Sequence, residues 1–167
     1  MIKNAQDIYN EMIEAYKNKD TEIFIKASDK FLEIADDMEY ITSGNKYYLL
    51  GRWIEQAKQL ADDTDDFTRK IYQFNAKALV TTWGSYSQSE IGGLHDYSNR
   101  QWSGLIGDFY KVRWKWWIDA RINELQNKPY EKDINWFEWE WKWVRQNKEY
   151  PTAVNDIDLH EISKRFK

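Results

Sequence analysis

The residues best suited to chemistry lie around one glycine-rich loop in the middle of the chain. Trp83 lies at the start of this loop, and His95, Asp96 and Tyr97 lie at its end. Exposed Trp and Tyr rings stack on the apolar C–H faces of sugars while their N–H and O–H groups remain available for hydrogen bonds. Trp83 and Tyr97 are therefore candidates for the rim of a saccharide cleft. The alternative interpretation is that Trp83 closes the end of a helical core.

The charged residues of this region also have alternative interpretations. Asp96 either caps the helix that follows the loop or accepts a hydrogen bond from a ligand hydroxyl. Arg113 lies among tryptophans, which predicts a structural ion pair or a cation–π contact, with Asp96, Asp108 or a ring as its partner. Glu90 and Asp96 form the acidic pair of the loop, but nothing in the sequence fixes the separation that glycoside hydrolysis requires. No catalytic residue is assigned.

Composition excludes several classes of ligand and partner. The chain has no cysteine, and its two histidines, His95 and His160, are far apart in sequence, so we expect no metal and no cofactor. A net charge of -4 argues against a nucleic-acid partner, because such domains gather Lys and Arg against phosphates. No stretch approaches the roughly 18 apolar residues of a membrane span, so no membrane partner is expected either.

Helical periodicity runs through most of the chain and sets the positions of these residues. A length of 167 residues suits one domain, and the fold class predicted is all-α, a single-domain antiparallel bundle of about six to seven helices. The tryptophans between Trp139 and Trp143 alternate as in a strand, but a helix is preferred because every neighbouring element is helical. The predicted helices cover about residues 3–18, 21–41, 47–61, 67–83, 96–126, 133–148 and 155–167.

Local signals predict where several helices begin and which positions of the long fifth helix face inward. Asp20, Thr64 and Asp133 are expected to act as N-caps, and Gly84 is expected to end the fourth helix. Cutting a buried ring of the fifth helix to alanine should cost about 3–5 kcal/mol, with Trp116 as the test. The inward positions expected on this helix are Trp102, Leu105, Phe109, Trp116, Ala120 and Leu125.

Four segments carry a resemblance to a known family. They are KYYLLGRWIEQAK at 46–58, FNAKALVTTWG at 74–84, LHDYSNRQWSGL at 94–105 and DFYKVRW at 108–114. In this order and spacing they resemble the C-terminal helical domain of the α-N-acetylglucosaminidases of glycoside hydrolase family 89. The likeness extends over about residues 30–165. The combination of W-G, D-Y-S-N and F-Y-x-x-R-W is more specific than any one of these motifs.

The resemblance implies an enzyme of several domains. These are a small N-terminal domain, a (β/α)₈-like barrel that carries the catalytic glutamates, and this helical domain packed against the barrel. Such an enzyme removes terminal α-linked N-acetylglucosamine from glycans with retention of configuration. The family's pocket residues fall on Trp83 and Tyr97, with Leu94 at a neighbouring position, while Asp96 and Arg113 give structural support. The barrel lies outside this chain, so the chain alone is expected to be inactive.

The sequence departs from the family pattern at two places, and two other classes of function remain as alternatives. Val112 lies where the family often has a proline, and the loop at 85–94 differs from the animal form, so the substrate beyond the terminal sugar is not predicted. A carbohydrate-binding module without hydrolysis would use the same aromatic rings. A helical protein-interaction module would expose a large apolar patch. The parent enzyme is expected to be secreted, periplasmic or lysosomal, which the sequence does not decide.

Overall fold

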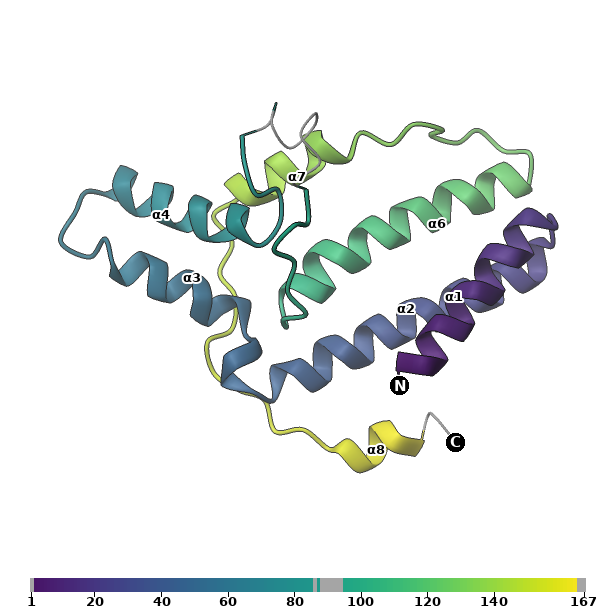
Figure 1. The fold of residues 1–167 in the computed structure, drawn as a ribbon, viewed down its shortest axis with the longest axis horizontal. Coiled ribbons are helices and arrows are strands. Elements are labelled where there is room, and N and C mark those ends of the chain that lie inside the picture. The colour runs from purple at the N-terminus through teal and green to yellow at the C-terminus, as the bar shows by residue number, and fades with distance from the viewer. Residues whose placement is uncertain (1, 86, 88–94, 165–167) are drawn as a thin grey trace.

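A computed structural model of the chain describes residues 2–85, 87 and 95–164. Within this part of the chain the secondary structure is helical, apart from an isolated bridge between Leu49 and Ser103 (Figure 1). This confirms the all-α prediction. The elements are α1 (Ile2–Lys17), α2 (Thr21–Ser43), η1 (Lys46–Tyr48), α3 (Leu50–Gln59), α4 (Asp66–Leu79), the π-helical turn η2 (Ile106–Tyr110), α6 (Lys111–Leu125), α7 (Trp136–Arg145) and α8 (Leu159–Lys164).

Two antiparallel hairpins form the body of the domain. α1 and α2 pair with each other and α6 packs against α2, while α3 and α4 form a second hairpin that contacts α7 (Figure 1). Each group has its own hydrophobic core, one around Met12 and Phe24 and the other around Leu50 and Phe109. The continuous helical segment of η2 and α6 joins the two cores, because Phe109 belongs to one and Ile118 to the other.

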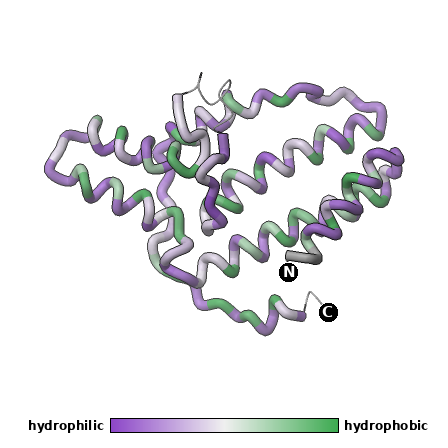
Figure 2. The backbone as a smooth tube through the Cα atoms, in the orientation of Figure 1, coloured by the Kyte–Doolittle hydropathy of each residue, from purple (hydrophilic) through white to green (hydrophobic). Residues whose placement is uncertain are grey.

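Hydrophobic and hydrophilic residues alternate along the helices, as Figure 2 shows. This is the pattern of helices that bury one face and expose the other. None of the helices in the described ranges is both long and apolar enough to cross a bilayer.

The fifth helix begins later than predicted. Asp96–Ser98 form a turn, and regular helical structure begins near Ile106, so the expected start at residues 96–98 is wrong. A carboxylate from a distant helix explains the difference. Glu39 of α2 accepts hydrogen bonds from the backbone N–H groups of Gly104 and Gly107, which satisfies donors that a local N-cap would otherwise take.

The N-caps agree with the sequence in one helix and differ in two. Asp20 caps α2 as predicted, by accepting a hydrogen bond from a backbone N–H three residues on. Asp65 caps α4, whereas the predicted Thr64 donates its hydroxyl to a carbonyl of the preceding turn. Asn135 caps α7, two residues after the predicted Asp133. The helix preferred for the alternating tryptophans is confirmed by α7. α8 begins at Leu159, later than the predicted start at residue 155, and residues 165–167 of that prediction lie outside the described residues.

The inward positions predicted for the long helix are confirmed at three of the six residues. Leu105, Phe109 and Ala120 are buried, whereas Trp102, Trp116 and Leu125 are half-buried. Trp116 packs against Trp136 and donates its indole N–H to Glu131 at 3.1 Å, near the surface. Phe109, with no exposed surface, is therefore the better position for testing the core.

A buried lysine ties the end of α4, which leads to the loop, to α7. The Lys77 ammonium has no exposed surface and donates to the backbone carbonyls of Trp143 at 2.6 Å and Gln146 at 3.0 Å. These carbonyls lie at the C-terminal end of α7, where a cation is favoured by the helix dipole. Burial lowers the pKa of Lys77 to about 8, although the negative charge of Asp108 acts in the opposite direction.

This lowered pKa predicts an alkaline gain in stability. Between pH 8 and 10.5 the unfolded chain binds the Lys77 proton and the folded chain releases it, so the free energy of unfolding rises with pH by about 2 kcal/mol from pH 7 to 10. Burial raises the pKa of Tyr110 and Tyr150, which reduces stability only above pH 10. Urea unfolding at pH 7, 8.5 and 9.5 should show the rise in the unsubstituted chain and in the exposed control Lys70→Met. Its persistence in Lys77→Met would contradict this assignment.

Candidate functional site

The chain leaves α4 through a tight turn that places Trp83. α4 ends at Leu79, before the predicted end at Gly84, and the N–H of Trp83 donates to the carbonyl of Ala78 at 2.7 Å. Trp83 has a φ of 62°, in the left-handed region that bulky residues rarely adopt. Backbone strain of this kind persists only where surrounding contacts hold it, and it is concentrated at functional sites.

The C-terminal end of the loop lies beside the turn that follows α4. The N–H of Asp96 donates to the carbonyl of Thr81 at 2.8 Å, and Asp96 also has a left-handed φ, of 59°. The two rings predicted to face a saccharide are thereby brought together, with the ring centroids of Trp83 and Tyr97 5.2 Å apart. Trp83 is half-buried and Tyr97 is 71% exposed, so neither ring is sealed in the core. We call these two residues the ring pair.

Two residues named from the sequence are not placed. Leu94, which the resemblance puts at a neighbouring pocket position, lies outside the described residues. Glu90, the other acid of the loop, also lies outside them. The predicted site can therefore be examined through Trp83, Asp96 and Tyr97 at the ends of the loop, and through Arg113 on α6.

Asp96 binds Arg113 instead of capping a helix. Its Oδ2 lies 2.7 Å from Nη1 of Arg113, and no helix of the described chain begins at this residue, so the cap interpretation is wrong. The Arg113 guanidinium also lies over the rings of Phe109, Tyr110 and Trp136, at 5.3–5.9 Å from their centroids. Both an ion pair with Asp96 and ring contacts are among the partners that the sequence predicts for this arginine.

Glu140 of α7 is a member of the site that the sequence reasoning missed. Its side chain has no exposed surface; Oε1 lies 3.2 Å from Nη1 of Arg113, and Oε2 forms a hydrogen bond with Nε2 of His95. Nδ1 of His95 lies 3.7 Å from Asp96. These four residues form what we call the charged cluster. The signal for Glu140 was its spacing, because Val144, one helical turn further on, lies on the same buried face.

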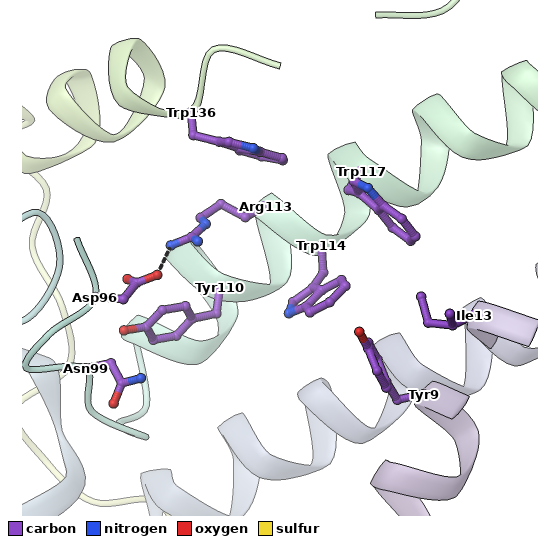
Figure 3. Close-up of a pocket in the computed structure, with 9 residues that line it drawn as sticks. All are labelled: Tyr9, Ile13, Asp96, Asn99, Tyr110, Arg113, Trp114, Trp117 and Trp136. Atoms are coloured by element: carbon purple, nitrogen blue, oxygen red, sulfur yellow. Dashed lines mark hydrogen bonds and ion pairs between the residues drawn. The ribbon is translucent and has the colours of Figure 1, made fainter. Parts of the chain in front are cut away.

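A cleft of about 530 Å³ opens beside the charged cluster, between α1, α6 and the start of α7 (Figure 3). Asp96, Asn99 and Arg113 supply its polar groups. Oδ1 of Asp96 is buried and has no hydrogen-bond partner among the described residues. Burial, followed by the charge of Asp96, raises the pKa of Tyr110. The apolar walls are Tyr9, Ile13, Tyr110, Trp114, Trp117 and Trp136.

This arrangement suits binding better than bond cleavage. Aromatic walls with a few convergent polar groups are typical of small-ligand sites. The two carboxylates of the charged cluster share Arg113, and Glu140 cannot touch a ligand because its side chain has no exposed surface. In the described ranges, no group of three or more His, Asp or Glu side chains is arranged to hold a metal ion.

Comparisons with known proteins agree with the motifs. Residues 1–167 match the family described as α-N-acetylglucosaminidase (NAGLU) C-terminal domain. The chain is 27% identical over 163 residues to the α-N-acetylglucosaminidase of Homo sapiens. The matched region is 95% of this chain and 21% of the human protein.

Solved structures of a family 89 glycoside hydrolase from Clostridium perfringens are similar in both sequence and fold. The structure of this enzyme in complex with PUGNAc is 43% identical to the chain, with a TM-score of 0.91. The match covers 96% of this chain and 19% of the clostridial chain. A variant with two Glu-to-Gln substitutions, in complex with its substrate GlcNAc-α-1,4-galactose, gives the same identity and TM-score over 18% of its length. The chain thus spans about a fifth of the length of these relatives.

Proposed function

Because this chain belongs to the family of α-N-acetylglucosaminidase C-terminal domains, we propose that it completes the sugar pocket of a family 89 glycoside hydrolase. The substrate is a glycan that ends in α-linked N-acetylglucosamine. The catalytic glutamates belong to a barrel domain against which the helices pack. Trp83 and Tyr97 form part of the pocket wall, with Leu94 beside them, and the helical chain alone has no hydrolytic activity.

The ring pair is the observation that carries this proposal. Trp83 and Tyr97 come from opposite ends of a loop, yet their rings lie 5.2 Å apart between centroids, and one of them is largely exposed. Rings in such a position offer an apolar face to a sugar and polar atoms to its hydroxyl groups. The left-handed backbone of Trp83 and Asp96 fits a site whose geometry is maintained for binding.

An apolar stripe on α4 supports docking of a partner domain. Phe67, Ile71 and Leu79 are 71%, 39% and 43% exposed, and their spacing places them along one side of the helix. Trp83 follows the end of α4 in the chain. A barrel that covered the stripe would bury these side chains and bring its own pocket to the ring pair.

The test is a fusion in which residues 1–167 replace the C-terminal helical domain of the clostridial enzyme. We expect the fusion to hydrolyse an aryl α-N-acetylglucosaminide, and the isolated chain to show no hydrolysis. The reference is the clostridial enzyme truncated before its helical domain. If the fusion is no more active than the truncated enzyme, the proposed function is wrong.

A second candidate function, saccharide binding without hydrolysis, is favoured by the cleft of Figure 3. Titration of the isolated chain with N-acetylglucosamine, followed by NMR of the indole N–H signals, separates the two. Binding that is lost in Trp136→Ala and kept in Trp83→Ala assigns the sugar to the cleft. Binding that is lost only in Trp83→Ala assigns it to the ring pair. Absence of binding contradicts a stand-alone binding module.

A further inference from the structure

We propose that Glu140 positions the ring pair through the charged cluster, although it cannot touch a sugar itself. The inference rests on the proposed function, because it assigns the ring pair a role toward a saccharide. Glu140 lies on α7, remote in sequence from both Trp83 and Tyr97. Its carboxylate nevertheless holds the two side chains, His95 and Arg113, that fix the end of the loop.

The end of the loop requires such a support. Trp83 and Asp96 both have left-handed φ values, 62° and 59°, and a bulky residue such as Trp83 is strained in this region unless surrounding contacts hold it. Among the described residues, the backbone joins these segments by a hydrogen bond from the N–H of Asp96 to the carbonyl of Thr81. Side chains add the ion pair of Asp96 with Arg113 at 2.7 Å.

The contacts lead back from the ring pair to α7 without a break. Arg113 is held between Asp96 and Glu140, with Nη1 at 2.7 Å from one carboxylate and 3.2 Å from the other. His95, next to Asp96 in the chain, forms a hydrogen bond with the second oxygen of Glu140. Both oxygens of Glu140 are therefore directed at the loop end, one through His95 and one through Arg113.

A purely structural role does not explain a charge at this position. Removing a carboxylate from water is unfavourable, and well-packed apolar residues often replace buried ion pairs without loss of stability. Glu140 is fully buried on α7, one helical turn before the buried Val144. The carboxylate gives what an apolar group cannot, namely a hydrogen bond to His95 and an ion pair with Arg113.

The test measures the loop end directly in the chain of residues 1–167. Glu140→Gln keeps the size of the side chain and removes its charge. We expect the amide of Asp96 to exchange with solvent at least about tenfold faster, and the NOE between the Trp83 and Tyr97 rings to be lost. Amides of α1 and α2 should keep their exchange rates. An unchanged Asp96 amide and ring NOE, or an equal acceleration of all amides, overturns the proposal.

Glu39→Gln is the matched control, because Glu39 is also a carboxylate that is shielded from solvent, in this case half-buried, and that binds a segment distant in the sequence. It should loosen the start of η2 and leave the ring NOE intact; loss of the NOE in this variant also overturns the proposal. Should Glu140→Gln fail to fold, His95→Gln removes one arm of the same contact. This variant is expected to loosen the Asp96 amide, and an unchanged amide counts against the proposal.

These measurements use no ligand, so they are independent of the activity of the fusion. An inactive fusion combined with a loosened ring pair in Glu140→Gln would reject the proposed function and keep the positioning role. An active fusion combined with an unchanged ring pair in Glu140→Gln would keep the proposed function and reject the positioning role.

Discussion

Replacement of Trp83 by alanine in the fusion is expected to lower kcat/KM for an aryl α-N-acetylglucosaminide by about 100-fold, or about 2.7 kcal/mol of transition-state stabilisation. On the proposed function, the substitution removes one wall of the sugar pocket, so the sugar is no longer held against the catalytic carboxylates of the barrel. The backbone at this position has a φ of 62°, which alanine also adopts only with strain, so the loop end will loosen as well.

The matched control for this experiment is Trp116→Ala. Trp116 is a half-buried tryptophan of α6 that packs on Trp136 and does not belong to the ring pair or line the cleft. The control should keep kcat/KM within about threefold, since substitutions away from a site have small effects. A Trp83→Ala fusion with unchanged kcat/KM and unchanged circular dichroism would show that Trp83 does not contact the reacting sugar.

The largest loss of stability is expected from Phe109→Ala, which should lower the free energy of unfolding by about 3–5 kcal/mol. Phe109 has no exposed surface, and its ring lies 4.8 Å from that of Trp143 and 5.3 Å from that of Trp139 between centroids. The substitution therefore opens a cavity between η2 and α7. Urea denaturation of the two variants, Phe109→Ala and Trp116→Ala, measures the difference.

Trp116→Ala should cost less, because its ring is partly solvated and hydrogen-bonded at the surface. Equal losses in the two variants, or a loss below about 1 kcal/mol in Phe109→Ala, would contradict the packing described for this core.

Helical periodicity was sufficient to predict the fold class, since α1, α2, α3, α4 and α7 each carry an amphipathic pattern. It failed where a tertiary contact determines the start of a helix. The fifth helix begins near Ile106 because Glu39, far away in sequence, accepts hydrogen bonds from Gly104 and Gly107. A local sequence pattern cannot indicate that a backbone N–H group donates its hydrogen bond to a side chain of another helix. The shifted caps of α4 and α7 are smaller errors with a local cause, because neighbouring polar residues compete for the cap position.

The candidate site was predictable in its rings and not in its support. Trp83 and Tyr97 could be named from residue type, loop position and family resemblance, and the structure brings the two rings together. Asp96 was predicted either to cap a helix or to bind a ligand hydroxyl, and its pairing with Arg113 was one of several options. Glu140 lies in a run of tryptophans and was not named from the sequence. The proposed function came from the family motifs and not from the chemistry of single residues.

The most direct measurement is a crystal structure of the fusion with 2-acetamido-1,2-dideoxynojirimycin, a ligand already seen with the clostridial enzyme. We predict that the Trp83 and Tyr97 side chains will both lie within about 4.5 Å of the bound ligand, the range of direct van der Waals contact. A ligand bound in the barrel with both rings remote from it would contradict the proposal that this helical domain completes the sugar pocket.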